Sequence, residues 1–362
     1  MDSPLAYLAM ALISVLLVSY GLRKNLRLAT IFGLSLPVLY SGLRSHSGTD
    51  FSKYVTMYQE VTSVSFQDFM STYTVEPTFY ILSITSKLLF DSPFLVFFSF
   101  SLLTIVFFYL GLIKHTSKTT HVVFAYLSYL LLLFPNTMNI ARQGLAISIV
   151  FYALSFIPTR NVRKYLKWML VATLFHYSTM IMLPVYLLNR VISNRITDAA
   201  NQIRILYLCA TVALIVPLVL IIGVNTLSLP AKYQDYITGN ESGANVLFYL
   251  SAVIMLCIAA IFMLYKKQNK ILSMYYYMYC MLTTALLCAG FFISETRRIS
   301  LYLLPFMGLL IPIVVDMLSP GIPKSIVKFS AYCYIIGYFI LFYVAAGYGG
   351  VFPYQTIFTR SY

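Results

Sequence analysis

The sequence predicts an all-α, polytopic integral membrane protein with about ten full transmembrane helices and two short or broken membrane segments. Of the 362 residues, 60% are hydrophobic and only 10% are charged. The mean hydropathy is +0.82, whereas about a quarter of the residues of a soluble protein are charged. Apolar runs of roughly 20 residues recur along the chain, and each is long enough to cross a hydrocarbon core of about 30 Å.

The apolar runs define the spans in chain order. The first run begins at Pro4 without a basic segment before it, so we expect a retained span rather than a signal peptide. Two apolar segments are left over: residues 77–90 are short for a crossing, and residues 165–188 could cross once. We place the full spans at roughly 4–22, 28–43, 94–113, 121–135, 139–157, 203–223, 246–265, 271–293, 299–318 and 326–346.

Basic residues set the predicted orientation, because cytoplasmic loops of membrane proteins are enriched in Lys and Arg. If residues 77–90 and 165–188 dip into the membrane without crossing it, 17 of the 25 Lys and Arg residues are cytoplasmic. A full crossing by residues 165–188 would move six basic residues outside, so the first topology is preferred. Both termini then lie outside, together with extracytoplasmic loops at 44–76 (continuing to 93), 224–245 and 294–298.

Composition also excludes several classes of protein. We expect one transmembrane helical domain over residues 1–362, because no polar stretch is long enough to bury a core of its own. The formal net charge is +14, but the basic residues are scattered through loops, which argues against a nucleic-acid partner. The five cysteines lack the spacing of metal ligands, and we expect neither a metal nor another cofactor.

Four arginines lie at predicted helix ends that face away from the cytoplasm, where few basic residues are expected. A guanidinium near the hydrocarbon is costly and usually holds an anion. We therefore expect these side chains to bind phosphate on a lipid carrier. They are Arg44, Arg142, Arg297 and Arg298.

The first motif, Arg44 to Phe51, directly follows the second predicted span. Its Gly, Thr and Asp residues are typical of a tight turn, which could simply close the helix end. The functional interpretation puts Arg44 on phosphate and Asp50 on a sugar hydroxyl or a neighbouring arginine.

Glu76 and Pro77 open the short apolar segment at 77–90. Proline in a first turn and a carboxylate just before it are common at helix starts. A partly desolvated carboxyl facing a cavity could instead act as a general base.

Residues 135–146 predict a helix that begins at Asn139 and carries Arg142 and Gln143 in its first turn. An arginine in a first turn opposes the helix dipole. An anion bound there would resolve the conflict, because the free N–H groups and the guanidinium would converge on it.

Two later motifs also have both a functional and a purely structural interpretation. The sequence Phe175 to Ser178 falls in the middle of the segment 165–188, where a broken helix would place His176 at a substrate site. The alternative is one long span with a buried, satisfied histidine. Arg297 and Arg298 follow Glu295, and the alternative there is an interfacial charge cluster.

Five short motifs occur in the order found in EpsG-like exopolysaccharide proteins and Wzy-type O-antigen polymerases, which the chain resembles over roughly residues 40–305. Phe51 stands where that family usually carries tyrosine. The motifs are Arg44 followed by Gly48-Thr49-Asp50-Phe51 and Tyr54, the pair Glu76-Pro77, Arg142-Gln143 followed by Ala146, Phe175-His176 followed by Ser178 and Pro184, and Arg297-Arg298 followed by Tyr302.

The resemblance implies a GT-C-like membrane glycosyltransferase that polymerises O-antigen, capsule or exopolysaccharide repeat units, as in lipopolysaccharide biosynthesis. The growing glycan would pass from undecaprenyl pyrophosphate to the next lipid-linked oligosaccharide. The enzyme would be a multi-pass protein of the bacterial cytoplasmic (inner) membrane, with its active site facing the periplasm or cell exterior. Its partners would be the undecaprenyl-pyrophosphate-linked oligosaccharide, the lipid bilayer and a separate chain-length regulator.

The reaction that the resemblance implies leads to a hypothesis for residue roles, because a departing pyrophosphate needs pre-placed cations and the acceptor hydroxyl needs a base. His176 or Glu76 would be the base, with His176 favoured because an imidazole can accept a proton near neutral pH. Asp50 would orient an arginine or a sugar. The residues that bind pyrophosphate and sugar would be Arg142 and Arg298 on the donor, Arg44 and Arg297 on either lipid phosphate, and Gln143 and Tyr302 beside them.

Three rival functions remain open from the sequence. A flippase for lipid-linked oligosaccharide would also need arginines, but it should show internal repeats, which are not seen. Another polyprenol-dependent glycosyltransferase or ligase would share the donor chemistry. An acetyltransferase of surface glycan would depend on acetyl-CoA.

Overall fold

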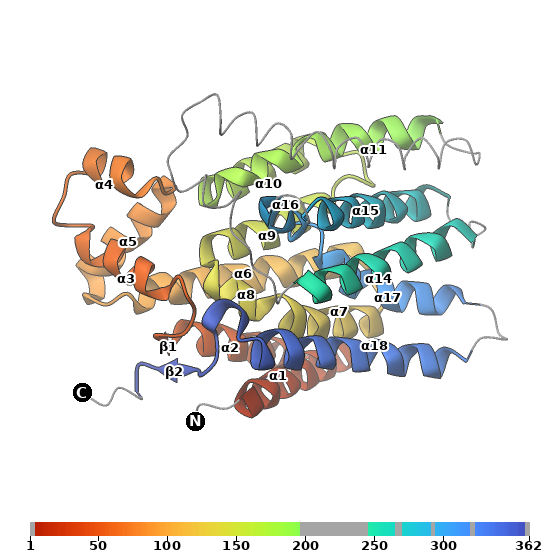
Figure 1. Ribbon diagram of the computed structural model, residues 1–362, viewed down its shortest axis with the longest axis horizontal. Helices are drawn as coiled ribbons and strands as arrows, with labels where there is room; N and C mark the ends of the chain where they lie inside the picture. Colours follow the sequence, from red (N-terminus) through yellow and green to blue (C-terminus); the bar gives the residue numbers. More distant parts are fainter. Residues whose placement is uncertain (1–3, 196–244, 265–269, 291–293, 319–322, 359–362) are drawn as a thin grey trace. The chain divides into compact units, whose positions relative to one another are not determined.

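The computed structural model describes residues 4–195, 245–264, 270–290, 294–318 and 323–358, and these residues are almost entirely helical (Figure 1). The predicted all-α class is therefore confirmed. The chain forms two compact units. The first comprises residues 1–156, 163–180 and 332–362, and the second comprises residues 157–162 and 181–331. The predicted single transmembrane domain stays a prediction.

The helices follow one another through short connections up to residue 195. They are α1 (Pro4–Lys24), α2 (Arg27–Gly42), α3 (Phe51–Glu60), α4 (Phe66–Tyr73), α5 (Pro77–Phe90), α6 (Phe94–His115), α7 (Thr119–Leu132), α8 (Phe134–Asn139), α9 (Ala141–Leu154), α10 (Val162–Phe175), the 3₁₀ helix η1 (Tyr177–Met182) and α11 (Pro184–Arg195). A two-residue strand, β1 (Arg44–Ser45), connects α2 to the loop before α3.

The remaining elements follow residue 244. They are α14 (Asn245–Leu264), α15 (Lys270–Ala289), α16 (Ser294–Ser300), α17 (Pro305–Met317), α18 (Lys324–Tyr338), the π-helical segment η2 (Phe339–Ala345), the 3₁₀ turn η3 (Tyr348–Gly350) and β2 (Gln355–Thr356). The strand β2 pairs antiparallel with β1. In the second unit, α15 packs against α11, α14, α16 and α17.

Within the described residues, three helices are long and apolar enough to cross a membrane: Pro4–Lys24, Phe94–His115 and Lys324–Ala345. The apolar helices identify a membrane protein, and the number of ten spans stays a prediction. The predicted span at 203–223 and most of the loop at 224–245 lie outside the described residues. Shorter apolar helices cover Thr119–Leu132, Ala141–Leu154, Leu250–Phe262, Tyr276–Ala289 and Pro305–Met317.

The segment after α15 differs from the sequence prediction. Residues 294–298, expected as a loop, lie in α16, and the span expected at 299–318 is interrupted by a turn at residues 301–304. Pro305 occupies the start of α17. Because proline has no N–H to donate, it begins a helix more readily than it continues one.

The core of the first unit is a set of closely packed helices in which α2 lies between α1 and α6, and α6 also packs on α9. Gly33 allows α1 and α2 to approach, because a Cβ added there would lie 2.8 Å from the carbonyl oxygen of Ser14. The Ser14 hydroxyl donates to the Gly33 carbonyl over 2.6 Å. It also bonds the Tyr126 hydroxyl of α7 over 2.9 Å, which joins three helices at one point.

One end of this unit gathers most of the polar motifs. In Figure 1, α3, α4 and α5 lie at the same end of the first unit as β1, β2 and α8. The helix α5 packs on α6, and α8 contacts both α9 and η3. Segments from the beginning, middle and end of the chain therefore meet there.

We expect Gly33→Ala to destabilise the protein by about 1–3 kcal/mol, because the added methyl group must push α1 away from α2. Thermal unfolding in detergent micelles measures the effect. Gly337→Ala in α18 is the matched control, because a Cβ at Gly337 meets no atom within 4 Å. Equal melting temperatures for the two variants would contradict the close approach of α1 and α2.

Candidate functional site

A buried carboxylate, Glu76, forms the centre of the site. It precedes Pro77 at the start of α5, but its side chain does not cap that helix. Its Oε2 atom accepts a hydrogen bond from Arg142 Nη1, with which it forms an ion pair. Its Oε1 atom lies 3.0 Å from Nδ1 of His176 and accepts the backbone N–H of Tyr177 over 3.1 Å. Three of the predicted site residues, Glu76, Arg142 and His176, thus lie in contact around one carboxylate.

His176 lies where a helix is interrupted. The helix α10 ends at Phe175, and the 3₁₀ helix η1 begins at Tyr177. The predicted break in the segment 165–188 is therefore present at His176, whereas its depth in a membrane stays a prediction. The hydroxyl of Thr78, two residues after Glu76, donates to the Leu174 carbonyl over 2.6 Å and ties the start of α5 to the end of α10.

The surroundings of Glu76 keep it ionised. Burial raises the pKa of this carboxyl, but the hydrogen bond from His176 and the positive charge of Arg142 outweigh it, and the net result is a pKa below the ordinary value. An ionised carboxylate only accepts hydrogen bonds, so the proton between Glu76 and His176 belongs to Nδ1. The other ring nitrogen, Nε2, is then the one that can accept a proton from a ligand.

Arg142 lies in the first turn of α9, as predicted, and Glu76 provides the anion that its position near the helix N-terminus requires. Its side chain is 15% exposed. The guanidinium carbon lies 5.9 Å from the ring centre of Tyr54 and 6.0 Å from that of Phe79. Its Nε–H is buried without a hydrogen-bond partner among the described residues. Gln143, the next residue, is also buried.

Arg44 points into the protein. Its Nη1 donates to the Ser41 carbonyl over 2.6 Å and to the Ser41 hydroxyl over 2.8 Å, and its Nη2 donates to the Met138 carbonyl over 2.8 Å. Its guanidinium carbon stands 4.5 Å over the ring of Phe97. Burial lowers the pKa of Arg44 to about 10, so it is a cation at neutral pH. Arg44 is only 2% exposed, and this burial disfavours the predicted direct contact with a lipid phosphate. The geometry favours a structural role, joining α2 to α8.

Asn139 was not expected among the site residues, yet it organises the loop before α3. It ends α8 rather than starting α9, because the chain leaves helical geometry at Ile140. Its Oδ1 accepts the Thr49 hydroxyl over 3.1 Å and the Asp50 N–H over 2.9 Å. Gly48 packs so closely that a Cβ there would lie 3.1 Å from the same oxygen. The only sequence signal was an amide residue next to an apolar helix.

Within the described residues, the Asp50 carboxylate pairs with a lysine and not with an arginine. It lies 3.3 Å from Lys53 Nζ, and its side chain is 32% exposed. Such an exposed pair contributes little to stability. The predicted role of Asp50 on a sugar hydroxyl stays a prediction.

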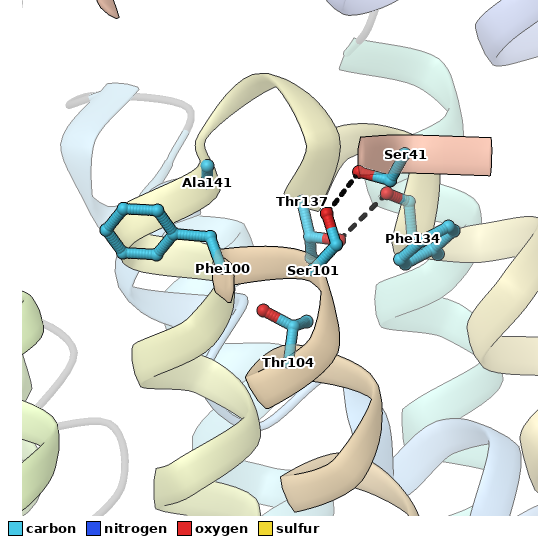
Figure 2. A pocket seen from close by; sticks show the side chains of 7 residues that line it. All are labelled: Ser41, Phe100, Ser101, Thr104, Phe134, Thr137 and Ala141. Atoms are coloured by element: carbon cyan, nitrogen blue, oxygen red, sulfur yellow. Dashed lines mark hydrogen bonds between the residues drawn. The ribbon is translucent and has the colours of Figure 1, made fainter. Parts of the chain in front are cut away.

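A small polar cavity lies beside Arg44's partner Ser41 (Figure 2). Its volume is about 10 Å³, enough for one water molecule and too small for a sugar. Ser101 donates to the Ser41 hydroxyl over 2.6 Å, and Thr137 donates to the Phe134 carbonyl over 2.8 Å. The lining residues are Ser41, Phe100, Ser101, Thr104, Phe134, Thr137 and Ala141.

The remaining predicted residues belong to the second unit. Arg297 and Arg298 lie in α16, and the Arg297 guanidinium carbon stands 5.7 Å from the ring centre of Phe248. Arg298 is exposed, and Tyr302 is fully buried. Their predicted participation in phosphate and sugar binding stays a prediction.

We expect Glu76→Gln to destabilise the protein by about 3–5 kcal/mol, because it leaves the Arg142 cation buried without its counter-charge. Asp91→Asn is the control, because the Asp91 side chain of the Lys87–Asp91 pair is 74% exposed and such a pair should contribute little to stability. Denaturant unfolding in micelles compares the two.

The pH dependence of the same comparison follows from the lowered pKa of Glu76. Folding lowers the pKa of the Glu76 carboxyl, so its ionised form stabilises the protein at any pH above the pKa that this carboxyl has in the unfolded chain. This stabilisation is lost as the pH falls through the pKa that the carboxyl has in the folded protein. The stability difference between the native protein and Glu76→Gln should thus be constant at neutral pH and shrink in acid. A difference that grows on acidification would contradict the ion pair.

Neither the curated proteins nor the solved structures include a match to the chain. The EpsG family matches residues 26–356, and this range includes every motif described above. Because the match covers most of the chain, this protein belongs to the EpsG family, which is associated with polysaccharide biosynthesis.

Proposed function

We propose that this protein is a membrane glycosyltransferase that polymerises polysaccharide repeat units. It transfers the growing glycan from undecaprenyl pyrophosphate to a hydroxyl of the next lipid-linked oligosaccharide, on the outer face of the bacterial cytoplasmic membrane. Membership of the EpsG family supports the reaction class. The observation that carries the proposal is the Glu76–His176 pair beside Arg142.

In this reaction His176 is the general base. Glu76 holds the Nδ1–H, so Nε2 carries the lone pair, and the side chain is 26% exposed and can meet a ligand. Nε2 takes the proton that the acceptor hydroxyl loses as its oxygen bonds to the anomeric carbon. Glu76 is the positioning residue, since it fixes the tautomer and stabilises the imidazolium that forms.

Arg142 acts on the leaving group. The bond between the anomeric carbon and the pyrophosphate oxygen breaks, and the pyrophosphate leaves with the electron pair. A cation beside that oxygen stabilises the developing charge. Because Glu76 already balances one positive charge, the diphosphate requires further cations. The sequence-based assignments of Arg298 to the donor pyrophosphate and of Arg297 to either lipid phosphate stay predictions. Arg44 supports the site from inside the protein and does not touch substrate.

His176→Gln should slow polymerisation by about 100-fold or more, which is the usual effect of removing a general base. The assay uses purified protein in nanodiscs, lipid-linked repeat units and gel separation of the polymer. Asp91→Asn should retain the native rate. A native rate for folded His176→Gln would overturn the assignment of the base. Polymer made by the purified protein alone would exclude the flippase, and independence from acetyl-CoA would exclude the acetyltransferase.

Arg142→Ala should lower the same rate by about 100-fold, comparable with the loss of one donor to a developing anion. Rates are normalised to protein that remains monodisperse, because the variant also leaves Glu76 unpaired. Arg23→Ala, at the exposed end of α1, is the matched arginine control. If both variants polymerise equally well, Arg142 does not act on the leaving group.

A further inference from the structure

The chain segment just before the C-terminus, residues 348–357, is bound to the loop that precedes α3. We name this segment the C-terminal clasp. Its strand β2 pairs with β1, with Arg44 opposite Thr356 and Ser45 opposite Gln355. Backbone bonds continue along the loop: the Gly48 N–H donates to the Gly350 carbonyl over 2.8 Å, and the Thr49 N–H donates to the Gly349 carbonyl over 3.0 Å. The clasp therefore holds the loop along most of its length.

Glycines encode the path of the clasp. Gly347, Gly349 and Gly350 have φ values of 63°, 73° and 60°, in the left-handed region that β-branched residues avoid. A Cβ at Gly350 would lie 3.2 Å from the Thr49 methyl group, whereas a Cβ at Gly347 would meet nothing within 4 Å. At Gly347 the requirement is thus purely conformational.

Aromatic side chains anchor the clasp to the helices. Tyr354 stacks on Tyr40 of α2 with ring centres 3.9 Å apart, and its hydroxyl donates to the Tyr40 carbonyl. Tyr348 packs on Phe342 with ring centres 4.2 Å apart. Both contacts attach the clasp to elements of the same unit, so it is part of that unit's packing and not a free end.

The loop passes this constraint on to the site. Arg44, on β1, donates to Met138 in α8, and Thr49 and Asp50 donate to Asn139 at the end of α8. Two residues after Asn139, α9 begins, and Arg142 lies in its first turn. The clasp also contacts α8 directly through η3.

We infer that the C-terminal clasp is a positioning element of the polymerisation site: by holding residues 43–50 against α8, it fixes the start of α9 and hence Arg142. This inference rests on the proposed function for its effect on rate. Its structural part, the coupling of the clasp to residues 135–143, stands independently. The clasp does not touch substrate, so its loss should lower kcat and leave KM unchanged.

The test compares Gly347→Val with Gly347→Asn, because asparagine tolerates the left-handed region and valine does not. Hydrogen exchange followed by mass spectrometry reads the amides of residues 43–50 and 135–143 in nanodiscs. Gly347→Val should increase exchange in both segments by about tenfold, with a matching fall in kcat, and Gly347→Asn should restore most of the protection. Phe358→Ala, at an exposed position beyond the clasp, is the unchanged control.

A chain that ends at Ala346 gives the stronger perturbation and should lose protection in both segments completely. Faster exchange at 43–50 with native exchange at 135–143 would overturn the coupling, whether or not the protein makes polymer. Faster exchange in both segments with native kcat would overturn the effect on the site. If the native protein makes no polymer, the proposed function fails while the exchange data still decide the coupling.

Discussion

The first unit depends on a buried carboxylate that accepts hydrogen bonds from two chain segments at once. A charged group removed from water is tolerated only where it is paired and hydrogen-bonded. Glu76 meets that requirement through Arg142, His176 and the N–H of Tyr177. These partners lie at the start of α9 and at the end of α10, and Glu76 itself precedes α5. The contacts of this one side chain therefore fix the relative positions of three helix ends.

The contact between Glu76 and His176 gives the two side chains different chemical roles. The neighbours that lower the pKa of Glu76 make it a weak base, and they also make it a good partner for an imidazole. The histidine therefore gains a fixed tautomer, with Nε2 left to act on a ligand. The ion pair of Glu76 and Arg142 has no net charge, so it can persist in a low-dielectric setting where an isolated guanidinium could not.

Around this centre the protein uses polar contacts at the boundary of an apolar bundle. Arg44 donates to carbonyl oxygens of α2 and α8, and the Asn139 side chain accepts hydrogen bonds from the loop before α3. Among the hydroxyls that line the small cavity, those of Ser41 and Ser101 are bonded to each other and that of Thr137 is bonded to a carbonyl. The C-terminal clasp adds backbone hydrogen bonds on the outside of this loop. Each of these sets of contacts pairs polar groups that the apolar bundle alone would leave without hydrogen-bond partners.

Local signals in the sequence predict the helical membrane class, the start of α5 at Pro77 and the place of Arg142 in a first turn, and they offer the interruption at His176 as one of two interpretations. These features depend on signals within a few residues, such as an apolar run, a proline or a polar break. Packing in three dimensions sets the remaining features. Glu76 faces Arg142 and His176, and Arg44 turns inward. Asn139 accepts hydrogen bonds from the loop before α3, and β2 returns to β1. The two contacts of Glu76 and the bond from the Gln355 N–H to the Ser47 hydroxyl join residues 66, 100 and 308 positions apart. Which donor meets which acceptor is set by the packing of the bundle, because most buried polar groups need a partner in three dimensions.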